Sequence, residues 1–98
     1  MTQFADGWEK LSPLERIAHW MKENKPRLRG HVKEYRTLLE NFSISVKNPA
    51  PIDYLNFQHD IRYYSPKHQE VLKDGFFAMY NLPQDAMKEQ KSFDPAMN

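Results

Sequence analysis

The chain contains no cysteine and only three glycines in 98 residues. The lack of cysteine excludes disulfides, thiolate nucleophiles and cysteine-based zinc sites. No glycine-rich segment is present that could wrap around a nucleotide phosphate. Hydrophobic runs are short, and none approaches the roughly 20 residues that span a bilayer. The opening residues MTQFADGWEKL lack the basic and apolar regions of a secretory signal, so we expect synthesis in the cytoplasm without secretion.

An excess of charge of either sign is also missing. Fourteen basic and 13 acidic residues leave a net charge of +1, which predicts no global attraction to nucleic acid or to an anionic membrane. Hydrophobic residues make up 40% of the chain and charged residues 28%, as is ordinary for a soluble globular protein. The length fits one domain with a modest core, in which the large aromatic side chains dominate.

Helix signals follow one another along the chain and predict an all-α bundle of about four helices. Ser12, Pro13 and Glu15 form a start signal, with serine as N-cap, proline at the first position and glutamate completing a capping box. A second helix is expected from about Pro26 to Phe42, with Gly30 weakening its first turns. Residues 43–51 are expected to form a loop or a short extended arm.

Two further helices are predicted as an antiparallel pair, over approximately residues 51–64 and 66–81. Pro51 opens the first of them and Ser65-Pro66 opens the second. Four residues of the first fall on one face, which we expect to point inward: Ile52, Leu55, His59 and Tyr63. The whole chain then divides into an N-terminal arm (1–11), a helical domain (12–83) and a polar C-terminal tail (84–98).

The most distinctive motif is His59-Asp60, with Tyr63 one turn later and Asp74 on the following helix. This HD-x-x-Y and D-x-x-F arrangement resembles the catalytic helix pair of the phospholipase A2 superfamily, including its viral and phage relatives. The resemblance covers about residues 48–80. It implies that His59 is a general base, that Asp74 accepts the other ring N–H of His59 and is itself hydrogen-bonded by Tyr63, and that Asp60 supplies oxygens to a calcium ion.

The rest of that active site is missing from the sequence. The family's calcium loop is rich in glycine, whereas this chain has no glycine between Gly30 and Gly75. A histidine hydrogen-bonded to an aspartate and a tyrosine also occurs as an ordinary way of satisfying a buried polar group. We therefore expect the His59–Asp74–Tyr63 network to be structural, with no cofactor. The alternative is a calcium-dependent lipid-ester hydrolase acting on phospholipid.

Two further groups of residues are candidates for binding. Five basic residues form a cluster that could meet phosphate, although acidic residues interrupt it: Lys22, Lys25, Arg27, Arg29 and Lys33. Five apolar residues in or beside polar stretches could anchor a protein partner: Phe4, Trp8, Trp20, Phe93 and Met97. No two of the four histidines have the helical spacing that forms a metal site.

The favoured interpretation is a non-catalytic accessory protein that acts through protein–protein contacts in a larger assembly. The resemblance extends this expectation to a bacteriophage protein associated with the virion. The hydrolase that uses His59 is the second hypothesis. A small helical protein that binds nucleic acid through residues 22–33 is the third.

Overall fold

The computed structural model describes residues 7–83, and helices joined by short turns make up this part of the chain. The four main helices are α1 (Pro13–Glu23), α2 (Val32–Ser45), α3 (Pro51–Asp60) and α4 (Pro66–Tyr80). Two short 3-10 helices flank α1, namely η1 (Trp8–Lys10) and η2 (Lys25–Leu28). Residues 7–83 contain no strand, so the prediction of an all-α fold with about four helices is confirmed.

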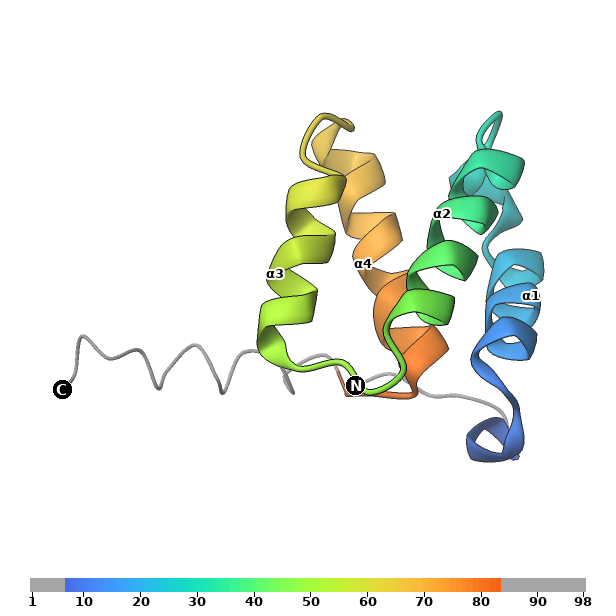
Figure 1. Cartoon of the computed structure of the whole chain (residues 1–98). Coiled ribbons are helices and arrows are strands. Elements are labelled where there is room, and N and C mark those ends of the chain that lie inside the picture. Colours follow the sequence, from blue (N-terminus) through green and yellow to red (C-terminus); the bar gives the residue numbers. More distant parts are fainter. Residues whose placement is uncertain (1–6, 84–98) are drawn as a thin grey trace, which may run out of the picture.

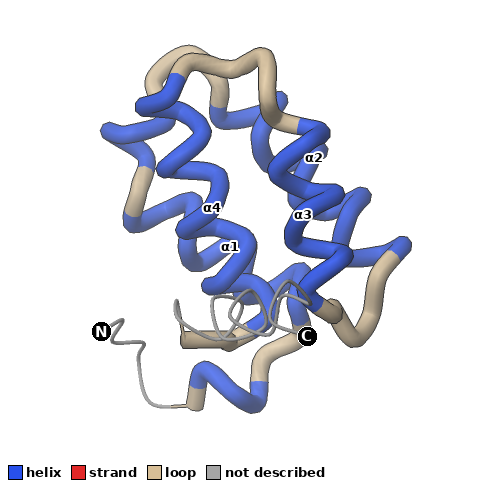
Figure 2. Tube along the Cα trace, turned by 90° about the vertical axis from the view of Figure 1, so that its left-hand side faces the viewer, coloured by secondary structure: helices blue, strands red, loops and turns tan. Residues whose placement is uncertain are grey.

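The helices run alternately up and down, so that neighbours in sequence are antiparallel (Figure 1). Seen from the side of α3, the bundle has two layers, with α1 and α4 in one and α2 and α3 in the other (Figure 2). One end of the bundle therefore gathers the end of α1, the start of α2, the end of α3 and the start of α4. The opposite end carries η1 and the loop between α2 and α3.

The helix starts that the sequence predicted are present. The Ser12 hydroxyl accepts a hydrogen bond from the Glu15 amide at 3.2 Å, and the Glu15 carboxylate accepts one from the Ser12 amide at 2.8 Å. Ser65 caps α4 in the same manner, accepting from the amide of His68. These caps satisfy amide groups that have no partner within the helix, which fixes where α1 and α4 begin.

The second helix begins and ends later than predicted. Gly30 has a φ of +78°, a left-handed conformation that favours glycine and interrupts the helix after η2. The regular helix starts only at Val32 and continues to Ser45. Residues 43–45, expected in a loop or an extended arm, form its last turn, and the buried Ser43 hydroxyl donates to the Glu40 carbonyl oxygen.

The inward face of α3 is also not the predicted one. Phe57 and the following Ile61 are fully buried, and Tyr54 is half-buried against the same core. Ile52, Leu55 and Tyr63 are exposed instead. The two sets of residues differ by a rotation about the helix axis, and the aromatic set fills the space toward α2 and α4.

Aromatic rings form the centre of this packing, around Phe76 of α4. The ring of Phe57 lies 5.1 Å from that of Phe76, and the ring of Tyr54 lies 5.0 Å from it. Phe42 of α2 contacts both phenylalanines at 5.3 and 5.8 Å. Tilted and edge-on ring pairs of this kind contribute about 0.5–1.5 kcal/mol each beyond the buried area. They hold α3 against α2 and α4.

At the end of the bundle that carries the loop between α2 and α3, η1 is attached to the end of α4. The indole N–H of Trp8 donates to the Ala78 carbonyl oxygen at 3.0 Å. Arg16 of α1 donates to the Trp8 and Met79 carbonyl oxygens, both at 3.0 Å. Trp8 and Trp20 are each only 6% exposed, so they belong to the core and are not available as interaction anchors. The folded unit therefore includes residues assigned to the predicted N-terminal arm.

Helix α4 ends where a left-handed residue, Asn81, allows the chain to turn away. The preceding Tyr80 donates a hydrogen bond of 2.6 Å to the Val46 carbonyl oxygen, just after α2. Burial raises the pKa of Tyr80 to about 12. This contact joins the ends of two helices that are far apart in the sequence.

We predict that replacing Tyr80 with phenylalanine lowers the free energy of unfolding by about 1 kcal/mol at neutral pH, because the Val46 hydrogen bond is lost. The phenol ionises near pH 10 in the unfolded chain but only near 12 in the folded one, so its contribution disappears as the pH rises through this interval. Urea unfolding at a series of alkaline pH values should show a steeper loss of stability for the wild type than for Tyr80→Phe. Equal slopes would contradict the assignment.

Candidate functional site

The histidine of the His59-Asp60 motif points away from the core. His59 is exposed on the last turn of α3, and its Nδ1 lies 2.9 Å from the Nη1 of Arg62. The same Arg62 nitrogen donates to the His59 carbonyl oxygen. Because a guanidinium can only donate, Nδ1 of His59 is the accepting nitrogen of this hydrogen bond.

Tyr63 is the most exposed of the large hydrophobic side chains in the described part of the chain, at 83%. The Arg62 guanidinium stacks on its ring at 4.3 Å from the ring centre, which is a cation–π contact. Tyr63 therefore belongs to an exposed group with Arg62 and His59. It does not orient a histidine in the core.

Asp74 lies on α4 and faces another part of the molecule. Its Oδ2 accepts a hydrogen bond of 2.8 Å from the Nη2 of Arg27 in η2, and both side chains are partly exposed. The exposed His59 ring forms its hydrogen bond with Arg62, and Asp74 bonds to Arg27, so the predicted His59–Asp74–Tyr63 network does not form in this structure. Its physical basis, an inward-facing His59, fails because Phe57 and Ile61 occupy the inner face.

Asp60, the residue that the resemblance assigns to calcium, is the exposed last residue of α3. Within residues 7–83, no group of three or more histidine, aspartate or glutamate side chains is arranged to hold a metal ion.

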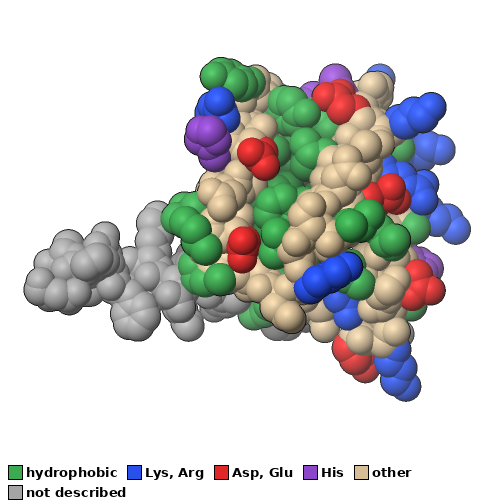
Figure 3. All heavy atoms as spheres, viewed as in Figure 1, with side chains coloured by type: hydrophobic (Ala, Val, Ile, Leu, Met, Phe, Trp, Pro, Cys, Tyr) green, Lys and Arg blue, Asp and Glu red, His purple; other side chains and the backbone are tan. Residues whose placement is uncertain are grey.

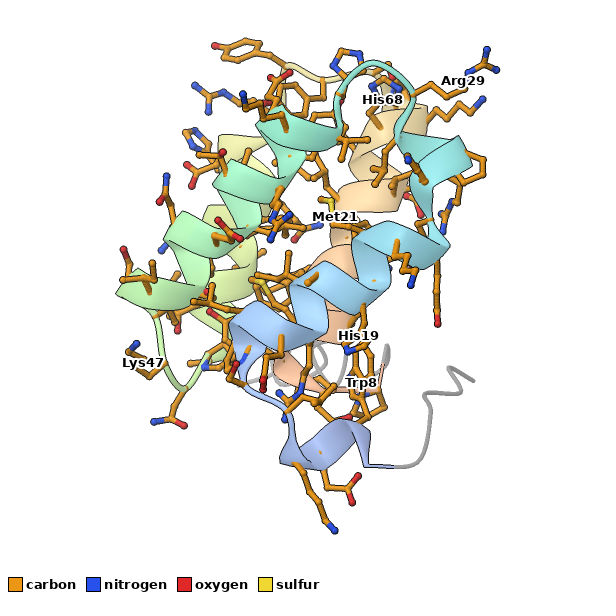
Figure 4. The ribbon with its side chains drawn as sticks, turned by 90° about the vertical axis from the view of Figure 1, so that its right-hand side faces the viewer. Trp8, His19, Met21, Arg29, Lys47 and His68 are labelled. Carbon is orange, nitrogen blue, oxygen red and sulfur yellow. The ribbon has the colours of Figure 1, made fainter. Side chains whose placement is uncertain are left out.

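A polar cluster that the sequence did not reveal lies between α2, the turn before α4 and the first turn of α4. The Tyr35 hydroxyl and the Nδ1 of His68 are 2.7 Å apart. His31 stacks on Tyr35 with ring centres 5.1 Å apart and meets His68 edge-on at 4.9 Å. Tyr35 is fully buried, whereas both histidines are half-buried. Figure 4 shows His68 at this end of the bundle.

Glu34 extends this cluster toward the surface. One carboxylate oxygen lies 3.2 Å from His31 Nδ1, and the other accepts the Tyr64 hydroxyl at 3.0 Å. The hydrogen bond from His31, followed by that from Tyr64, holds the pKa of Glu34 below its ordinary value. Burial raises the pKa of the Tyr35 phenol, whose hydroxyl shares a hydrogen bond with His68. The cluster ties three chain segments together.

The outward face of α3 is the largest departure from an ordinary polar helix surface. Ile52 is 59% exposed and Leu55 is 55% exposed; the exposed His59 follows on the last turn of α3, and Tyr63 lies in the turn beyond its end. Hydrophobic side chains mark this outer edge in Figure 3, on the left. Burying such side chains removes apolar area from water, which favours a contact with a partner.

The basic cluster lies at the end of α1, in η2 and at the start of α2. Its five members are exposed, namely Lys22, Lys25, Arg27, Arg29 and Lys33. Figure 3 shows lysine and arginine side chains gathered on that side of the molecule, away from the outer edge of α3. The candidate anchors Phe4, Phe93 and Met97 lie outside the described residues.

The chain matches no protein-family model, no curated protein and no solved structure. The resemblance to the phospholipase A2 helix pair thus stays a prediction, beyond the observation that α3 and α4 are antiparallel. Among residues 7–83, no helix has both the length and the apolar composition needed to cross a bilayer.

We predict that His59→Gln changes the free energy of unfolding by no more than about 0.5 kcal/mol, as expected for an exposed side chain. Tyr35→Phe should lower it by about 1–3 kcal/mol, because it leaves a polar atom of the inner cluster without its partner. Urea unfolding of both variants tests the pair. A larger effect for His59→Gln than for Tyr35→Phe would restore the buried His59 network.

We also predict that Glu34 contributes to acid stability. The pKa of its carboxyl is lowered by folding, so its contribution is present above the ordinary value of 4.5 and is lost as the pH falls through the lowered value. Glu34→Gln should show less decline in unfolding midpoint over this acidic interval than the wild type. Thermal unfolding followed by circular dichroism gives the comparison. The control variant is Glu9→Gln, because the other exposed candidate, Glu15, caps α1.

Proposed function

We propose that this protein is a non-catalytic accessory protein that binds another protein through the outer face of α3. The single observation that carries the proposal is the group of exposed apolar side chains formed by Ile52 and Leu55 on this face and Tyr63 in the turn after it. These residues recur at the spacing that a partner helix or groove can contact on one side. The opposite face of α3 is fully used by the core, so the outer face is free for such a contact.

The chemistry of the face defines the partner that fits it. Ile52 and Leu55 provide an aliphatic contact near the start of α3, and Arg62 stacked on Tyr63 provides a cation just beyond its end. A partner helix with aliphatic residues at one end and a carboxylate at the other would complement both. Aromatic residues and arginine are the types that most often dominate binding energy when a partner covers them.

The hydrolase hypothesis draws no support from this arrangement. Its general base, His59, is bound to an arginine on the surface, and its orienting carboxylate, Asp74, is bound to Arg27. The further expectation of a bacteriophage virion rests on the resemblance of residues 48–80. It is compatible with a protein whose role is to bind other proteins.

We predict that Leu55→Asp weakens partner binding by about tenfold or more, which corresponds to about 1.4 kcal/mol, because it places a charge in the apolar contact. A photo-crosslinking residue at position 56 should capture a defined protein in the cells that make this chain. That adduct should be lost in Leu55→Asp and retained in the control Lys47→Asp, at an exposed site outside α3. Equal capture by both variants would count against the α3 face, and unfolding midpoints close to that of the wild type confirm that both are folded.

A separate measurement addresses the hydrolase. With micellar phospholipid and calcium, we expect the rate of ester hydrolysis to be the same for wild type and His59→Gln. We also expect calcium to leave the melting temperature unchanged, since a ligand that binds the folded state would raise it. Hydrolysis that disappears in His59→Gln would replace the proposed function with the enzymatic one.

A further inference from the structure

Most of the basic residues in the cluster are exposed and form no salt bridge within the described part of the chain, although acidic residues lie among them in the sequence. Residues 22–34 contain five basic and two acidic residues, a net charge of +3 within a chain of net charge +1. Arg27 is held by Asp74. The other four cations form no salt bridge within residues 7–83, and all four are exposed: Lys22, Lys25, Arg29 and Lys33.

The acidic residues that interrupt the cluster in sequence do little to neutralise it. Glu34 is turned to His31 and Tyr64, which occupy both of its carboxylate oxygens. Asp74, from α4, pairs with Arg27, the one basic residue of the cluster that takes part in a salt bridge within residues 7–83. Glu23 is exposed and forms no salt bridge within residues 7–83. The local positive potential is therefore greater than the sequence order implies.

The shape of this surface adds a second observation. A shallow, open hollow of about 540 Å³ is lined by Lys25, Pro26, Arg29, Gly30 and Val32. The turn at Gly30 leaves open space beside its Cα, and Arg29 reaches away from the bundle there (Figure 4). Helix α2 starts at the rim of the hollow, so the positive end of its dipole faces the same space.

From this arrangement we propose that the surface formed by η2 and the start of α2 binds the phosphate backbone of a nucleic acid. Four exposed cations without a salt bridge in residues 7–83, two of which (Lys25 and Arg29) line the hollow, suit a ligand with a repeating negative charge. The large exposed hydrophobic side chains lie in other parts of the described chain, so this surface has no group of that kind to insert into a membrane. Segment 22–33 contains no phenylalanine, tyrosine or tryptophan on which a base could stack, so the contacts in this proposal are those to phosphates. The site is separate from the α3 face and does not depend on it.

The test measures binding of the whole chain to a short fluorescently labelled DNA duplex by anisotropy, over a range of salt concentrations. Four phosphate contacts predict a slope of log association constant against log salt of about −3.6. The double variant Arg29→Glu/Lys33→Glu should weaken binding by at least about tenfold and reduce the slope to about half. The matched control, Lys10→Glu/Lys47→Glu, makes the same change in net charge at the other end of the bundle, where Figure 4 places Lys47.

The control variant should change affinity by less than about threefold, since only the overall charge differs. No binding at low salt, an equal loss in both double variants, or a slope near zero would overturn the proposal. Vesicles of phosphatidylserine and phosphatidylcholine, and polyglutamate, are tested as competitors at equal charge. If either displaces the duplex as well as unlabelled DNA does, the surface recognises charge in general and the assignment to nucleic acid fails.

Discussion

The packing of α3 through its aromatic face is the constraint on which the rest of this structure depends. A ten-residue helix at the edge of a small bundle can bury only one side. Here that side carries Tyr54 and Phe57, whose rings meet Phe76 of α4. Once these rings are inside, the positions between them must face solvent. The same packing therefore leaves His59 outside the core and leaves Ile52, Leu55 and Tyr63 exposed.

This constraint also explains which parts of the fold could be read from the sequence. The starts of α1 and α4 were predictable because Ser12 and Ser65 bond to amides three residues away, so the signal is local. The register of α3 was not, because two apolar sets occur in it at helical spacing. Only the rings that α2 and α4 present decide between them, and no residue within α3 reveals that choice. The end of α2 was missed for a related reason, since Ile44 and Val46 alternate as in a strand.

The candidate sites also combine features that are visible in the sequence with contacts that only the fold creates. The exposed cations of residues 22–33 were visible as a cluster, but their pairing was not, because Asp74 lies 47 residues from Arg27. Likewise, His68 and Tyr35 are 33 residues apart and meet only after α4 packs beside α2. The HD-x-x-Y motif attracted a catalytic interpretation because its residue types are those of an active site. Residue type and spacing alone, however, do not determine which way a helix faces.

The hydrogen bond from Trp8 to Ala78 has a consequence for how the bundle opens. It joins residues that are 70 positions apart, so it can form only after α4 has packed against α1. Closing so long a loop has an entropic cost of its own. A local opening at this end of the bundle would break this contact and the hydrogen bond from Arg16 to the Trp8 carbonyl oxygen. Such an opening would expose the indole of Trp8 and free the Ala78 carbonyl oxygen. The end of the bundle at η1 would then be locally open, with the aromatic core around Phe76 still closed.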